Sequence, residues 1–238
     1  MTDFPEIRAL TFDVFGTVVD WRSGIAREAE NMLAPKGVTL DWGAFANAWR
    51  KPILAAMAPV RSGARSYVVM DALHRETLDV ALAEFNITGL DETEKHRLAM
   101  GWRRLDPWPD SIEGMNQLKA KHAVVALSNG NIALVLSMAK RAGIPWDTIL
   151  GADLVNTYKP DAAIYDSAAR FLDIAPQQIM MVACHLGDLD AAKSRGLRTA
   201  YVHRPLEWGE GTERPLPAVG TYDVIVHSFT ELAEVMGA

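Results

Sequence analysis

The stretch Leu10-Thr11-Phe12-Asp13-Val14-Phe15-Gly16-Thr17 decides the fold, because an apolar strand there runs directly into an aspartate and a Gly-Thr turn. A carboxylate at the end of a buried strand is shielded from water on one side and open to ligands on the other, which suits a nucleophile in an α/β protein. The residue two positions after Asp13 is Phe15, which cannot donate a proton to a leaving group. The stretch therefore predicts a nucleophilic aspartate, and the phenyl ring disfavours phosphoryl transfer.

Strands and helices alternate in the chain from Pro107 onward. The expected strands are Ile7–Phe12, Ala123–Leu127, a short one near Ile149, Ile179–Ala183, Thr199–Val202 and Val224–Val226. The expected helices are Ser111–Lys121, Ile132–Ala142, Ala162–Leu172, Asp188–Arg195 and a last one that begins with a Ser228/Glu231 capping box. Such alternation is typical of a parallel sheet with helices on both faces, so we expect a Rossmann-like α/β core.

The region between the first strand and Pro107 has the pattern of an inserted helical cap domain. Apolar residues recur three or four positions apart in segments 42–53, 73–85 and 98–105, and Asp41 is placed to begin the first helix. No convincing strand occurs between Trp21 and Asp106. We therefore expect a core domain of residues 1–20 and 107–238 and a cap domain of residues 21–106. The cap would lie over the carboxyl edge of the sheet, where open α/β sheets bind ligands.

The composition is ordinary for a globular enzyme and argues against several classes of partner. A formal net charge of −6, without a basic run, disfavours nucleic-acid binding. No apolar stretch is long enough to predict a membrane span. The single cysteine, Cys184, excludes an internal disulfide and fits a reducing compartment. The acidic start, Met1 to Glu6, is unlike a signal peptide, so we expect a cytoplasmic protein.

Four polar groups follow apolar strands or lie near their ends, and we expect them to meet at one edge of the parallel sheet. They are Asp13 with Thr17, Ser128 with Asn129, Lys159, and His185 with Asp188. Lys159 beside Asp13 would keep the carboxylate ionised and attract a small anionic substrate. Two assignments stay open here. Ser128-Asn129 either caps the following helix or binds an anion, and Tyr165 either packs in its helix or aims its hydroxyl at the pocket.

Together these residues resemble the haloacid dehalogenase superfamily, and more narrowly its type II 2-haloacid dehalogenases. The matching motifs are Phe12-Asp13-Val14-Phe15-Gly16-Thr17, Leu127-Ser128-Asn129-Gly130, Tyr158-Lys159-Pro160-Asp161, and Asp188 ahead of Ala191-Ala192. The resemblance covers nearly the whole chain, including the helical cap. It implies that Asp13 attacks the halogen-bearing carbon to form an ester, which water then hydrolyses with help from Asp188.

The resemblance also implies roles for the other polar residues. The implied catalytic set is Asp13, Thr17, Arg50, Ser128, Lys159, Tyr165, His185 and Asp188. The substrate carboxylate would be held by Ser128, Asn129 and backbone amides near Phe15 and Gly16. Arg50, on the first predicted cap helix, would receive the halide.

Two departures from the superfamily pattern bear on metal dependence and on the pocket. Superfamily phosphatases carry an aspartate where this chain has Cys184, so with Phe15 two carboxylates of a magnesium site are absent. We therefore expect catalysis without a metal or other cofactor, and Cys184 is expected to be a small buried side chain. His185 stands where an asparagine commonly shapes the pocket, and it either closes a strand end or faces the pocket as a proton donor. Trp21-Arg22 either closes the pocket or packs the hinge.

The preferred interpretation is a hydrolase that converts short (S)-2-haloacids into (R)-2-hydroxyacids. Two alternatives keep the same machinery: a hydrolase that opens the ring of azetidine-2-carboxylate, whose amine must be protonated, and a dehalogenase that prefers fluoroacetate. A small-molecule phosphatase would depend on magnesium, which Phe15 and Cys184 disfavour, and a binding module would show no turnover. The exposed cap helices could pair two copies in a homodimer, so the oligomeric state stays open.

Overall fold

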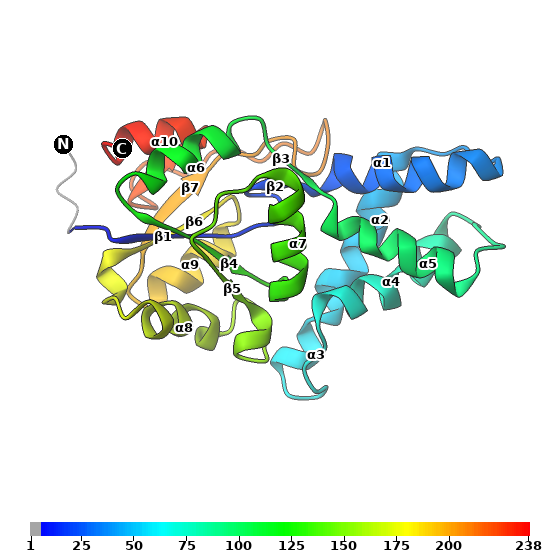
Figure 1. Cartoon of the computed structure of the whole chain (residues 1–238), viewed down its shortest axis with the longest axis horizontal. Helices are drawn as coiled ribbons and strands as arrows, with labels where there is room; N and C mark the ends of the chain where they lie inside the picture. Colours follow the sequence, from blue (N-terminus) through cyan, green and yellow to red (C-terminus); the bar gives the residue numbers. More distant parts are fainter. Residues whose placement is uncertain (1–5) are drawn as a thin grey trace.

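Strand β1 (Ala9–Phe12) is fully buried near the middle of a six-stranded parallel sheet with the order β5-β4-β1-β6-β7-β8. The structure is a computed structural model that describes residues 6–238 (Figure 1). The other strands of the sheet are β4 (Ala123–Ser128), β5 (Thr148–Gly151), β6 (Ile179–Ala183), β7 (Arg198–Val202) and β8 (Val224–Val226). Ala9 pairs with Ala123 on one side and Ile179 on the other, so β1, β4 and β6 begin at the same level. The predicted parallel sheet is therefore confirmed, and residues 1–5 of the acidic start lie outside the described residues.

Helices cover both faces of the sheet (Figure 1). The helices α6 (Ser111–Lys119) and α10 (Phe229–Val235) pack together on one face, and α8 (Ala162–Leu172) and α9 (Leu186–Ser194) lie on the other. The remaining helix of the core, α7 (Ile132–Ala142), follows β4. Only half of the predicted capping box forms at α10. The hydroxyl of Ser228 accepts the Glu231 N–H at 3.0 Å, as a capping box requires. The Glu231 carboxylate, however, accepts the N–H of His227 and not that of Ser228.

The inserted region forms the expected helical cap to one side of the sheet (Figure 1). Its helices are α1 (Trp21–Leu33), α2 (Trp42–Ala56), α3 (Ala58–Arg61), α4 (Met70–Glu84) and α5 (Glu92–Ala99). Short 3-10 turns are η1 (Ala34–Lys36) and η2 (Met100–Arg103) in the cap, and η3 (Ala152–Leu154) and η4 (Pro176–Gln178) in the core. Asp41 caps α2 as expected, by accepting the N–H of Ala44 at 2.9 Å. The segment predicted as a third helix is instead split between the end of α5 and η2, and helix α1 was not predicted individually.

The chain passes between core and cap at two adjacent crossings. Strand β2 (Val19–Asp20) carries it into the cap and strand β3 (Asp106–Pro107) carries it back, and the two pair antiparallel. Ser111 reinforces this pair because its hydroxyl donates to the carbonyl of Val18 at 2.8 Å. The crossings fall beside the predicted boundaries at residues 20 and 107, although the division into two domains stays a prediction. Within residues 6–238, no helix has both the length and the apolar character needed to cross a bilayer.

Candidate active site

A buried lysine joins two buried aspartates at the carboxyl edge of the sheet. Asp13 follows β1, and Asp188 lies in the first turn of α9. The Nζ atom of Lys159 is 3.2 Å from Oδ1 of Asp13 and 2.6 Å from Oδ2 of Asp188. Each of the three residues is less than a tenth exposed. The sequence placed these residues at one sheet edge, and the structure brings them into direct contact.

The pKa values of the two aspartates are shifted in opposite directions. Burial by itself would raise the pKa of Asp13, but the Lys159 ammonium and hydrogen bonds from His185 and Thr17 outweigh it and hold that pKa below its usual value. Burial raises the pKa of Asp188 above its usual value despite the same lysine, and the negative charge of Asp13 adds to the rise. Asp13 is therefore a stable anion, whereas Asp188 is the more basic carboxylate.

Two hydroxyls orient these carboxylates. Thr17 Oγ1 donates to Oδ2 of Asp13 at 2.8 Å, and the Tyr165 hydroxyl donates to Oδ1 of Asp188 at 2.7 Å. The Tyr165 ring is fully buried in the face of α8, so this residue packs in its helix and also aims its hydroxyl at the site. Neither hydroxyl lines the cavity, and both therefore act on the carboxylates rather than on a bound ligand.

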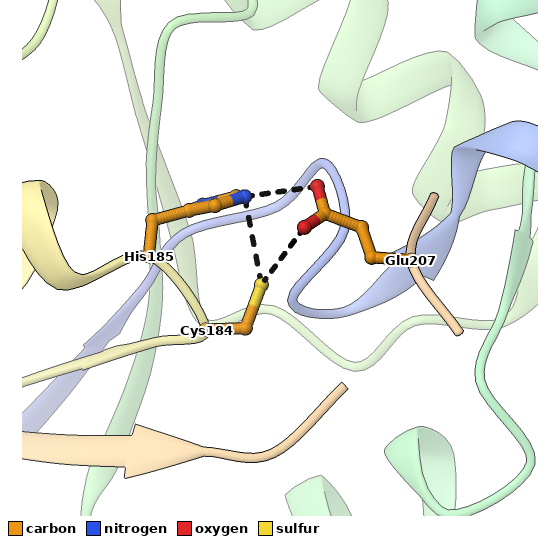
Figure 2. A group of neighbouring side chains, drawn as sticks. All are labelled: Cys184, His185 and Glu207. Atoms are coloured by element: carbon orange, nitrogen blue, oxygen red, sulfur yellow. Dashed lines mark hydrogen bonds and ion pairs between the residues drawn. The ribbon is translucent and has the colours of Figure 1, made fainter. Parts of the chain in front are cut away.

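His185 links Asp13 to a second acid, Glu207, and Figure 2 shows its contact with Glu207. Its Nδ1 lies 3.1 Å from Oδ2 of Asp13, and its Nε2 lies 2.9 Å from Oε1 of Glu207. Burial would lower the pKa of His185, but Cys184, the Glu207 carboxylate and the hydrogen bond to Asp13 raise it well above its usual range. The pocket-facing alternative for His185 therefore agrees with the structure, and the imidazolium sits between two carboxylates.

Glu207 is the acidic residue of this site that the sequence did not predict, and the lining residues Leu54, Met57, Arg61, Met70, Trp208 and Arg214 were not predicted either. It lies in the loop after β7, it is only 5% exposed, and its Oε1 accepts the indole N–H of Trp21 at 3.2 Å. Gly16 has φ +91°, and a Cβ atom placed there would overlap the Glu207 carboxylate. The close approach therefore requires glycine at position 16. A signal was present in the sequence, because a glutamate that follows a strand at the carboxyl edge belongs to the same class as the four predicted polar groups.

Arg50 of α2 brings a buried guanidinium to the cap side of the site. Its Cζ lies 5.4 Å from the centre of the Phe15 ring, 5.5 Å from Trp21 and 5.6 Å from Trp102. Its Nε has no hydrogen-bond partner, and no carboxylate forms an ion pair with it among residues 6–238. Aromatic faces attract the cation without neutralising it, so the guanidinium keeps its capacity to bind an anion. Trp21 helps to build this cage, whereas Arg22 packs against the backbone of Gly43 and Gly209.

These groups surround a cavity of about 370 Å³ between core and cap. The core side of its lining includes Asp13, Phe15, Asn129, Lys159, His185, Asp188 and Glu207, and the cap side includes Arg50, Leu54, Met57, Arg61 and Met70. The carboxylates, the lysine and the histidine thus come from the core, whereas the cap adds apolar surface and the guanidinium groups of Arg50 and Arg61. Such a cavity fits a small anionic ligand with an apolar part.

Two groups expected to bind the substrate carboxylate, the Ser128 hydroxyl and the Gly16 N–H, are engaged in hydrogen bonds within the protein. Ser128 is fully buried outside the cavity lining, because its hydroxyl accepts the N–H of Gly130 at 2.9 Å and shapes the turn before α7. The Gly16 N–H donates to the carbonyl of Val19 at 3.0 Å, so it is not free to hold a substrate. Asn129 does line the cavity. Its Oδ1 accepts the Lys159 N–H at 2.7 Å, which leaves its Nδ2 as a donor.

One group of side chains at this edge combines three metal-ligand types. The ligand atoms of Cys184, His185 and Glu207 all lie within 4.8 Å of one another (Figure 2). Cys184 is buried, as the sequence predicted, and burial raises the pKa of its thiol. Magnesium prefers several hard oxygen ligands, and a thiol together with the Phe15 ring does not supply them.

Comparisons with known proteins agree with this geometry. Residues 7–196 match the family model of the haloacid dehalogenase-like hydrolases. (S)-2-haloacid dehalogenase 1 of Pseudomonas sp. (strain CBS-3) is 30% identical over 216 residues, which cover 87% of this chain and 91% of that protein. (S)-2-haloacid dehalogenase 4A of Burkholderia cepacia is 29% identical over 201 residues, which cover 83% of this chain and 84% of that protein.

Solved structures give the same result for the whole fold. The crystal structure of the defluorinating L-2-haloacid dehalogenase Rha0230 matches with a TM-score of 0.94 at 44% identity, covering 98% of this chain and 96% of that chain. The L-2-haloacid dehalogenase PA0810 matches with a TM-score of 0.92 at 42% identity, covering 97% and 99%. The sheet and its inserted cap are thus those of these enzymes. The chain belongs to the haloacid dehalogenase-like hydrolases, within the branch of the (S)-2-haloacid dehalogenases.

Proposed function

We propose that this protein removes halide from short (S)-2-haloacids and releases (R)-2-hydroxyacids through an ester on Asp13. One relationship carries the proposal: an ionised, buried Asp13 and the unpaired guanidinium of Arg50 line the same cavity. A nucleophile and an anion acceptor are the two groups that displacement of a halide requires. The chain's relatives named above add support, because they are (S)- or L-2-haloacid dehalogenases.

The first step is attack of Asp13 on the carbon that bears the halogen. Oδ2 accepts two hydrogen bonds, from Thr17 at 2.8 Å and from His185 at 3.1 Å, whereas Oδ1 has one contact, with Lys159 at 3.2 Å. Oδ1 therefore keeps more lone-pair density for the attack. An O–C bond forms as the C–halogen bond breaks, and attack from the rear inverts the carbon centre. The pair of electrons leaves with the halide, which Arg50 receives inside its aromatic cage.

The second step is hydrolysis of the Asp13 ester. Asp188 has the raised pKa and takes a proton from water, which attacks the carboxyl carbon of Asp13. Lys159 and the Tyr165 hydroxyl hold Asp188 in place at 2.6 and 2.7 Å. The oxygen from water enters Asp13, the bond between the Asp13 carboxyl carbon and the ester oxygen breaks, and the leaving alkoxide takes the proton from Asp188. The C–O bond to the substrate carbon stays intact. The configuration set in the first step is therefore kept in the hydroxyacid.

The substrate carboxylate is oriented by the core side of the cavity. Asn129 donates from Nδ2, because its Oδ1 is already occupied by the Lys159 backbone. Met57 and Met70 face the substituent on the reacting carbon. No step uses a metal ion, since Phe15 and Cys184 stand where superfamily phosphatases place carboxylates.

The protonated His185 favours fluoride as a second leaving group. His185 is held protonated at the cavity wall with its Nε2–H on Glu207, and exchange of that bond for one to the leaving group would supply a donor to fluoride, the halide that gains most from one. A defluorinating relative at 44% identity is consistent with such use. The same donor would serve the amine released from azetidine-2-carboxylate. We therefore propose fluoroacetate as a further substrate, with ring opening as the alternative to be tested beside it.

The test measures halide release from each enantiomer of 2-chloropropionate in excess EDTA. We expect release from the (S) form alone, no loss in EDTA, and no release by Asp13→Asn. Asp41→Asn keeps a capping side chain that does not line the cavity and should retain full activity. A single turnover in heavy-oxygen water should label Asp13 and leave the product unlabelled.

Three results would redirect the assignment. No release from either enantiomer would overturn the haloacid proposal and move the test to fluoroacetate and azetidine-2-carboxylate. Hydrolysis of phosphate esters that requires added magnesium would favour a phosphatase. Ligand binding without turnover of any of these compounds would favour a binding module.

A further inference from the structure

The group formed by Cys184, His185 and Glu207 has the spacing of a metal site (Figure 2). Nε2 of His185 lies 3.6 Å from Sγ of Cys184 and 2.9 Å from Oε1 of Glu207, and Sγ lies 4.0 Å from Oε2 of Glu207. Tetrahedral zinc with ordinary Zn–S, Zn–N and Zn–O bonds needs separations of about 3.4–3.6 Å between its ligand atoms. The two contacts of Glu207 use different oxygens, so binding through both oxygens, or a turn of the carboxylate that brings one of them to the ion, would complete this geometry.

The surroundings support these ligands in the way that known zinc sites do. A histidine that binds zinc through Nε2 usually donates from Nδ1 to a carboxylate, and Nδ1 of His185 lies 3.1 Å from Oδ2 of Asp13. Trp21 donates to Glu207 and fixes its carboxylate, and the missing Cβ of Gly16 makes room for it. His185 and Glu207 line the cavity, so a fourth coordination position would open toward bound water or substrate.

The donor set also selects the ion. A thiolate and an imidazole favour zinc over magnesium or calcium, and the single carboxylate completes a set that neutralises a dication. We propose that Cys184, His185 and Glu207 bind Zn²⁺ as a three-residue inhibitory site beside Asp13. Binding releases the thiol proton and the Nε2 proton to solvent, while the bond from Nδ1 to Asp13 remains.

Occupation of this site would stop the reaction for two physical reasons. The ion displaces the Nε2 proton of His185, and with its fourth ligand it occupies the cavity wall beside Asp13, where it obstructs the approach of a substrate to that carboxylate. Inhibition thus rests on the proposed dehalogenase activity, whereas binding of the metal does not. The two parts are therefore measured separately.

Cobalt tests the binding without any substrate. The chain has one cysteine, so a thiolate-to-cobalt charge-transfer absorption can arise from Cys184 alone. EDTA-treated protein titrated with Co²⁺ should show this absorption at one equivalent, and Zn²⁺ should remove it. Cys184→Ala should abolish it, and Cys184→Ser should weaken binding at least tenfold, whereas His203→Ala should keep it as a histidine control. Glu207→Gln should weaken cobalt binding at least tenfold.

Halide release tests the consequence. Zinc should inhibit the natural protein reversibly, with recovery in EDTA, and Cys184→Ala should retain its activity while requiring at least tenfold more zinc for the same inhibition. Absence of the cobalt absorption would overturn the site, as would an affinity unchanged in Glu207→Gln. A cobalt site in a protein that turns over no haloacid would support the metal site and refute only the dehalogenase proposal. Equal zinc sensitivity of Cys184→Ala and the natural protein would overturn the inhibitory role.

Discussion

The Nζ atom of Lys159 lies 2.6 Å from Oδ2 of Asp188, and the side chains of both residues are less than a tenth exposed. Breaking a buried ion pair by removing one partner leaves an uncompensated charge, which costs about 3–5 kcal/mol of stability. Lys159→Met should therefore unfold at lower denaturant concentration. It should also lose about 100- to 1,000-fold in kcat/KM, because Asp13 loses its strongest stabilising charge. Lys140→Met, on the exposed face of α7, should change neither quantity. Full activity in Lys159→Met would remove this lysine from the mechanism.

Glu207 should control the pH dependence of fluoride release. The raised pKa of His185 means that its protonated form persists as pH rises and is lost only above that pKa. Glu207→Gln removes a carboxylate 2.9 Å away and should lower the His185 pKa. The alkaline limb of the rate profile with fluoroacetate should therefore move to lower pH. The profile with bromoacetate should move less, because bromide leaves without a donor, and identical shifts for both substrates would contradict a donor role.

Gly16→Ala should disturb the site through Glu207. The substitution imposes strain at positive φ and also places a methyl group where the Glu207 carboxylate lies. Gly63 offers a matched control, because it has φ +75° and a Cβ there meets nothing within 4 Å. Gly63→Ala should cost about 1 kcal/mol, and Gly16→Ala a further ~1–3 kcal/mol from overpacking. The Gly16 variant alone should reproduce the pH shift of Glu207→Gln, and equal effects of the two alanines would rule out the clash.

His74 should make the fold sensitive to acid. Its ring is fully buried and stacks on Trp102 at 4.4 Å, and both of its nitrogens lack partners among the described residues. Burial, with the charge of Arg50, lowers the pKa of His74 well below 6.5. The unfolded chain then binds a proton that the folded chain does not, so stability falls as pH drops below about 6.5.

His74→Phe keeps an aromatic ring and should flatten this loss. Near pH 5 the variant should gain about 1–2 kcal/mol of unfolding free energy relative to the natural protein, with a smaller difference near pH 8. His96→Asn removes an exposed histidine and should leave the pH slope unchanged. Denaturant unfolding across this pH range measures the effect. A steeper slope in the His74 variant would contradict the assignment.

The cavity should accept more than the smallest haloacids. Its volume of about 370 Å³ exceeds the space that a two-carbon acid fills, and buried Met57 lines the cap side. We expect turnover of 2-bromopentanoate by the natural protein. Met57→Trp should reduce kcat/KM for that substrate by about 10-fold or more and leave bromoacetate within about twofold. Equal losses with both substrates would show that position 57 does not set chain length.

The sequence predicted those parts of the site that local patterns encode. Asp13, Lys159 and Asp188 each follow a recognisable strand or precede a helix, and the parallel topology brings such positions to one edge. Glu207 escaped prediction because the loop from 203 to 223 has no periodic pattern, and its pairing with His185 is made only by the tertiary fold. Strands β2 and β3 have two residues each, which is too short for an alternating pattern to appear. The Arg50 cage depends on rings from three separate segments.

The paired crossings β2 and β3 have a consequence for how such enzymes diversify. Everything between them enters and leaves the core at one place. The cap supplies the halide acceptor Arg50 and the side chains Leu54, Met57, Arg61 and Met70 to the cavity, whereas the carboxylates of the cavity come from the core. Mutations in this single contiguous stretch of the gene can reshape what is recognised while the charge arrangement of the core is inherited intact. Enzymes of this architecture can therefore share one reaction while they accept different substrates.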